Sequence, residues 1–136
     1  MLDLSEIPII DNHLHPPLRA AGSPGEGDFR RLFVESDFAE QLDHVEHSLT
    51  FMRAVADLAR LLGVDGGDWR AVRDARHALG PEGWYRRCLE GGNVRGLLVD
   101  YGYSTGDQLD HAELRALAGS AGAEVWPVYR LETALQ

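Results

Sequence analysis

The apolar residues of this 136-residue chain form three short runs, and the segments between the runs have helical spacing. The runs lie at about residues 7–12, 94–101 and 124–130 and are rich in branched or aromatic side chains. Runs of this length and composition are typical of buried strands. We therefore predict three strands, separated first by a helical excursion over about residues 37–91 and then by a helix over about residues 110–121.

Two of the predicted helices carry signals at their ends. Between residues 51 and 62, apolar side chains recur every three or four positions while charged side chains take the opposite face. Ser48 or Thr50 can cap the start of this helix, and Gly63 can end it in the left-handed conformation. Asp110 and Glu113 have the spacing of a capping box, which indicates where the later helix begins.

The order of these elements indicates the fold class. Parallel strands need crossover connections of a dozen or more residues, and both connections are long enough. The sequence therefore predicts an α/β fold. Pro127, inside the third run, argues against a fully paired central strand there, because proline has no N–H to donate.

Charge and composition narrow the range of partners and compartments. The formal net charge is −9, which would repel a polyanion, so we expect no nucleic-acid partner. Cys88 is the only cysteine, which excludes an intrachain disulfide. No signal peptide is recognisable and no run approaches the ~20 apolar residues of a membrane span, so a cytoplasmic protein without a membrane partner is expected.

The residues that carry candidate chemistry follow the first strand. Side chains two positions apart on a strand point the same way, so Asp11, His13 and His15 are expected to share one face. Two imidazoles about 6.5 Å apart along a strand can converge on one metal ion. Asp11 could then fix the tautomer of a ligating imidazole by accepting its N–H.

These residues also resemble a known family. The segment IIDNHLHP at residues 9–16 is similar to the Asp-x-His-x-His motif that ends the first strand in the amidohydrolase superfamily, and it most resembles the amidohydrolase-2 group, whose domains occur alone or fused to glutamine-synthetase-like domains. Looser similarities cover almost the whole chain, at residues 31–37, 48–63, 91–101 and 129–132.

The resemblance implies a (β/α)8 TIM barrel in which zinc or a similar divalent ion activates a water that attacks a carbonyl of a small-molecule substrate. It implies that His13 and His15 are metal ligands and that the bond cleaved is an amide, another carbon–nitrogen bond or an ester. The substrate-facing candidates at the ends of the second and third strands are Asp100, Tyr101, Arg130 and Glu132. Asp100 could instead cap a loop, and Arg130 could instead form a surface ion pair. A metal-dependent decarboxylase of the same fold is the alternative, and a carboxylate-binding Arg130 would favour it.

The chain departs from the family in its length. A whole barrel takes about 250 residues, whereas three predicted strands form only the N-terminal part, and the family's ligands from later strands are missing. The chain is therefore expected to be a fragment, inactive by itself, or else a non-catalytic partial barrel that acts through protein contacts. Unpaired strand edges would also allow it to form oligomers.

Overall fold

The computed structural model of the protein describes residues 6–23, 27–34, 36, 38–102 and 107–131. The chain divides into two compact units. One, called here the sheet unit, consists of residues 1–21 and 82–136, and the other, the helical unit, consists of residues 22–81.

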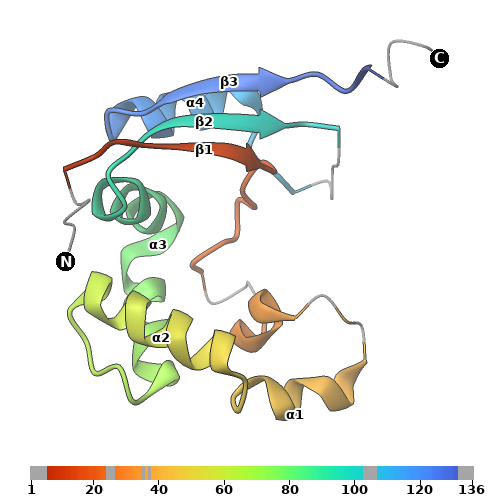
Figure 1. Ribbon diagram of the computed structural model, residues 1–136, viewed down its shortest axis with the longest axis vertical. Coiled ribbons are helices and arrows are strands. Elements are labelled where there is room, and N and C mark those ends of the chain that lie inside the picture. The colour runs from red at the N-terminus through yellow and green to blue at the C-terminus, as the bar shows by residue number, and fades with distance from the viewer. Residues whose placement is uncertain (1–5, 24–26, 35, 37, 103–106, 132–136) are drawn as a thin grey trace. The chain divides into compact units, whose positions relative to one another are not determined.

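The sheet unit contains a parallel sheet. Its strands are β1 (Ile9–Leu14), β2 (Val94–Asp100) and β3 (Glu124–Val128), in the order β1-β2-β3. Both neighbouring pairs are parallel, and the three arrows lie side by side and point the same way in Figure 1. The prediction of an α/β fold with parallel strands is confirmed. Because the strands are parallel, their carboxyl ends meet at one edge of the sheet.

Two helices accompany the sheet in this unit. One is α4 (His111–Ser120), which lies behind β2 and β3 in Figure 1. Its predicted capping box is confirmed, because the Asp110 carboxylate accepts the N–H of Glu113 at 2.9 Å and the Glu113 carboxylate accepts that of Asp110 at 2.8 Å. The other is the second part of α3 (Trp69–Gly91). Gly80 interrupts α3 with φ 67° and ψ 175°, a conformation that side chains rarely adopt, so α3 consists of two helices.

One face of the sheet forms the core of this unit. Leu97, Val99 and Val125 pack with Leu114 and Ala118 of α4, and Val99 and Ala118 are completely buried. Burial of branched apolar side chains of this kind contributes about 1.5–3 kcal/mol each. The core therefore fixes which face of each strand turns toward the helices.

The other face of the sheet is apolar and more exposed. A Cβ atom at Gly96 would lie 2.6 Å from Cζ3 of Trp126 and 3.4 Å from Cγ1 of Ile10, so these three residues share this face. Ile10 is 61% exposed and Trp126 is 43% exposed. Gly96 is needed here because the indole ring lies directly over its backbone.

Some strand boundaries differ from the predicted ones. The first strand begins and ends two residues later than expected, so His13 lies inside β1. The third strand ends at Val128, which leaves Arg130 beyond it. Pro127 is paired with Val99 within β3, and β3 is an edge strand among the described residues, the position where proline is tolerated.

The helical unit contains short 3₁₀ segments and longer helices. The 3₁₀ segments are η2 (Phe29–Phe33) and η3 (Ala39–Gln41), and η2 lies before the helical excursion expected over about residues 37–91. The α-helices are α1 (Leu42–Val45), α2 (Leu49–Leu62) and the first part of α3. The predicted ends of α2 are confirmed by a cap from Ser48 and by Gly63 at φ 71°. None of the helices among the described residues combines the length and apolar character needed to cross a membrane.

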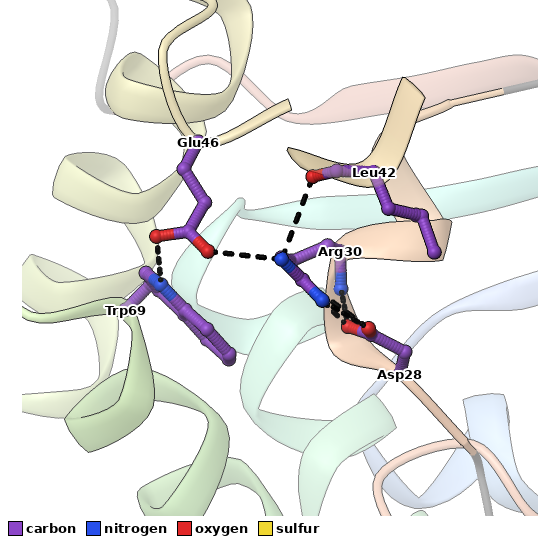
Figure 2. A network of polar contacts seen from close by, with 5 residues as sticks. All are labelled: Asp28, Arg30, Leu42, Glu46 and Trp69. Carbon is purple, nitrogen blue, oxygen red and sulfur yellow. Dashed lines mark hydrogen bonds and ion pairs between the residues drawn. The ribbon is translucent and has the colours of Figure 1, made fainter. Parts of the chain in front are cut away.

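A polar network ties the helical unit together (Figure 2). The Arg30 guanidinium donates to Asp28 at 2.7 Å and to Glu46 at 3.1 Å, and the indole N–H of Trp69 donates to Glu46 at 2.9 Å. Hydrogen bonding from Trp69, followed by that from Arg30, lowers the pKa of Glu46. The Trp69 ring also stacks on Phe29 with centroids 6.0 Å apart, which joins the network to the buried aromatic core.

Candidate metal centre

The candidate site lies at the carboxyl edge of the sheet. His13 is the penultimate residue of β1, His15 follows the strand, and Pro16 and Pro17 end the extended segment. Asp100 is the last residue of the neighbouring strand β2. Side chains from two adjacent strands are therefore available at the edge where parallel α/β proteins place ligands.

Tertiary structure brings three potential metal-binding side chains together here. One donor atom each from His13, His15 and Asp100 lies within 4.8 Å of the others. The two imidazole rings meet edge to face, with centroids 5.1 Å apart and an angle of 82° between their planes. His13 is exposed, whereas Asp100 is only 3% exposed. The group is therefore reachable from solvent on its imidazole side and anchored in the protein on its carboxylate side.

The main chain of Asp100 contacts one of the two imidazoles. Nδ1 of His15 lies 3.3 Å from the carbonyl oxygen of Asp100. Because a carbonyl oxygen can only accept, Nδ1 carries the proton in this contact, and this tautomer has its lone pair on Nε2. The partner lies 85 residues away in the chain and is a backbone atom, so no sequence signal could have revealed it.

The Asp100 side chain is held as an anion. It accepts from Nε of Arg130 at 2.9 Å and from Nη2 at 2.7 Å, and the N–H of Gly102 donates to its Oδ1 at 2.8 Å. Hydrogen bonding from Arg130, and then from the Gly102 amide, lowers the pKa of Asp100 to about 2. A charged carboxylate therefore faces the two imidazoles at neutral pH.

An irregularity in the register of β1 lies between Asp11 and Leu14. Asp11 pairs with Leu97 and Leu14 pairs with Val99, so three steps along β1 match two along β2. Such an irregularity interrupts the simple alternation of faces that placed Asp11 beside His13. Asp11 lines an apolar cavity of about 250 Å³ together with Leu14 and Leu97, and its carboxylate accepts the backbone N–H of His13 at 3.2 Å. Its proposed role in orienting an imidazole ring stays a prediction.

The remaining candidates lie in different places. Tyr101 packs against the helix-facing core and its hydroxyl lies 3.3 Å from Nδ1 of His111. Burial raises the pKa of Tyr101. Arg130 turns toward Asp100, which agrees with an ion pair more than with an open substrate-binding position. Glu132 lies outside the described residues.

The three side chains suit a divalent ion both in the chemistry of their donor atoms and in the distances between those atoms. Two imidazoles and one carboxylate form a donor set that occurs in catalytic zinc sites. Bonds of about 2.0–2.2 Å in a tetrahedral arrangement place donors roughly 3.4 Å apart, so side-chain movements of about 1 Å would bring these three into range. Among the residues that the structure describes, no other three His, Cys, Asp or Glu side chains come this close together.

Comparison with known proteins gives two partial matches. Over 98 residues the chain is 37% identical to protein fluG of Emericella nidulans, and the matched segment is 68% of this chain and 11% of that protein. A solved structure from Lactobacillus casei ATCC 334, provisionally described as a metal-dependent hydrolase, has a TM-score of 0.67 and 22% identity, covering 96% of this chain and 33% of its own. No protein-family model matches the chain.

The two matches show which fold the chain shares and how much of each known protein it covers. The chain shares the fold of part of the Lactobacillus casei protein, with the three parallel strands included in a match over nearly its whole length. It spans about a tenth of the length of fluG and a third of the length of the solved protein. The activities of those whole proteins are therefore a matter for the proposal that follows.

Proposed function

We propose that this chain is part of a metal-dependent hydrolase in which His13, His15 and Asp100 hold a divalent ion, zinc in the first instance. The observation that carries the proposal is the convergence of these three donors within 4.8 Å at the carboxyl edge of a parallel sheet. The description of the Lactobacillus casei protein as a metal-dependent hydrolase supports it. The proposed reaction is hydrolysis of an amide, another carbon–nitrogen bond or an ester in a small molecule.

The residues of this chain would contribute binding and charge. The contact with the Asp100 carbonyl keeps the His15 ring in the tautomer whose Nε2 can bind an ion. The Asp100 carboxylate supplies a negative charge that favours a divalent cation, and its burial keeps bulk water from screening that charge. A bound ion would supply Lewis acidity, lowering the pKa of a water and polarising the substrate carbonyl.

The proposal also extends to the architecture of the parent protein. We propose that the three strands belong to a (β/α)8 barrel of the amidohydrolase kind, near the amidohydrolase-2 group. In such barrels the carboxyl ends of the strands carry the chemistry, which agrees with the position of the candidate site. The exposed apolar face around Ile10 and Trp126 would then be the interior face of the barrel, covered by later strands.

The decarboxylase alternative rests on the resemblance to the same family and stays a prediction. Arg130 gives it little support, because its guanidinium binds Asp100 through two nitrogen atoms. The non-catalytic alternative predicts instead that the three side chains hold no ion.

Metal content tests the proposal. The full chain is stripped with a chelator, incubated with zinc, desalted and analysed by mass spectrometry, beside His13→Ala and the control His47→Ala. His47 is an exposed histidine of the helical unit, so its loss should leave zinc unchanged, whereas His13→Ala should lose most of it. Full zinc occupancy in His13→Ala would overturn the ligand assignment. Zinc-dependent hydrolysis of a panel of amides and esters by the parent protein separates an enzyme from a metal-binding structural protein, because this chain is expected to be inactive by itself.

A further inference from the structure

Arg130 reaches the candidate site from a third strand. It lies two residues beyond the end of β3, yet its guanidinium binds the carboxylate at the end of β2. Nε and Nη2 both donate, at 2.9 Å and 2.7 Å to the same oxygen, and Nε also lies 3.2 Å from the other. The Asp100 side chain is 5% exposed and the Arg130 side chain is 38% exposed, so a nearly buried anion is held by a half-buried cation.

The Arg130 side chain passes close to the backbone of Gly102. A Cβ atom at Gly102 would lie 2.7 Å from both Cδ and Nε of Arg130 and 3.0 Å from Oδ1 of Asp100. Each of these distances is shorter than the contact of about 3.5–4.0 Å that carbon atoms prefer. Gly102 also donates its N–H to the same carboxylate. One residue therefore provides both a hydrogen bond and the space for the arginine.

We infer that Arg130 is a positioning residue of the proposed metal centre, holding the Asp100 carboxylate in the orientation in which it joins His13 and His15, while Gly102 leaves room for the guanidinium. The inference rests on the proposed function. A carboxylate has about four acceptor positions. Nη2 and Nε of Arg130 take two on Oδ2 and the Gly102 N–H takes one on Oδ1, so an ion would use the fourth, on Oδ1, in place of the longer 3.2 Å contact from Nε. Carboxylate ligands in proteins are generally hydrogen-bonded in this way, and their partners affect metal affinity.

A lysine could not replace the arginine fully. The guanidinium is planar and rigid, so two of its nitrogen atoms fix the rotation of the carboxylate as well as its position. A lysine ammonium supplies the charge as a single point and leaves that rotation open. Comparing the zinc affinity of Arg130→Lys with that of wild type therefore separates positioning of the carboxylate from simple neutralisation of its charge.

The test measures metal affinity in the full chain. Zinc affinity is determined by competition with a chromophoric chelator for Arg130→Gln, Arg130→Lys and Asp100→Asn. The matched control is Arg19→Gln, since Arg19 forms a two-nitrogen ion pair with Glu113 in the same unit and neither residue is among the three donors. We expect about 10–100-fold weaker zinc binding in Arg130→Gln, a smaller loss in Arg130→Lys, and no change in Arg19→Gln.

Two further measurements keep the outcomes distinct. Thermal unfolding identifies any variant that has lost its fold, and the visible spectrum of the cobalt-loaded protein reports a change in the ligand set that a merely structural role would not produce. Wild-type zinc affinity in Arg130→Gln, or tighter binding, would overturn the inference while leaving the proposed function intact. Unchanged zinc binding in His13→Ala would instead overturn the proposed function.

Discussion

Replacing Gly102 by alanine should weaken the metal centre although no ligand is altered. The added methyl group would lie 2.7 Å from Cδ and Nε of Arg130, and relief of this overlap needs a displacement of about 1 Å to reach ordinary contact. The hydrogen bonds from Arg130 to Asp100 are 2.7–2.9 Å long, so the same displacement would carry them beyond the range of useful hydrogen bonds.

The size of the effect follows from this geometry. Overpacking by one methyl group costs about 1–3 kcal/mol of folding free energy, and loss of the carboxylate's partner is expected to weaken zinc binding about 10-fold. Arg130 is partly exposed and can swing outward, which would reduce the folding cost but still leave Asp100 without its guanidinium. We therefore expect Gly102→Ala to weaken zinc binding about 10-fold even where its free energy of unfolding changes little.

A second glycine provides the control. A Cβ atom at Gly119, in the last turns of α4, would meet nothing within 4 Å, so Gly119→Ala should raise stability by about 0.5–1 kcal/mol through helix propensity and leave zinc affinity unchanged. Both variants are compared with the wild-type full chain by chelator competition and by denaturant unfolding. If Gly102→Ala binds zinc and unfolds like wild type, the argument that the guanidinium requires a glycine is refuted.

Three other predictions concern separate parts of the chain. Asp11→Asn should keep its zinc affinity, because an amide oxygen can still accept the His13 N–H, and a large loss in zinc titration would instead favour a role of the carboxylate in orienting a ring. Hydrogen bonding from Arg30 lowers the pKa of Asp28 below its ordinary value of 3.8, so this pair stabilises the fold fully above that pH and less as the pH falls below it. Between pH 5 and 3, the free energy of unfolding measured in urea should therefore fall less for Asp28→Asn than for wild type. An equal fall in both proteins would contradict the assignment. Ser48→Ala should cost about 1 kcal/mol in denaturant unfolding by removing the cap of α2, while Ser48→Asp should retain most of that stability.

Sequence alone determined the elements whose cause is local. The cap of α2, for which the sequence offered Ser48 or Thr50, the left-handed end at Gly63 and the capping box of Asp110 and Glu113 each depend on residues within three or four positions of one another. The apolar runs likewise predicted strands, and the connections between them are long enough for the crossovers that parallel strands need. The spacing of the two histidines allowed them to share one metal ion for the same reason, because it depends on a single strand.

Tertiary structure decided which residues lie beside the two histidines. Asp100 reaches the histidines through the pairing of β1 with β2, Arg130 reaches Asp100 from beyond β3, and the irregular register of β1 pairs Asp11 with Leu97. Register depends on how whole faces pack, and a shift of one residue exchanges the two faces of a strand. The partners at this site are separated by 30 and 85 residues, so their proximity follows from the packing of the sheet and helices, which no local pattern in the sequence encodes.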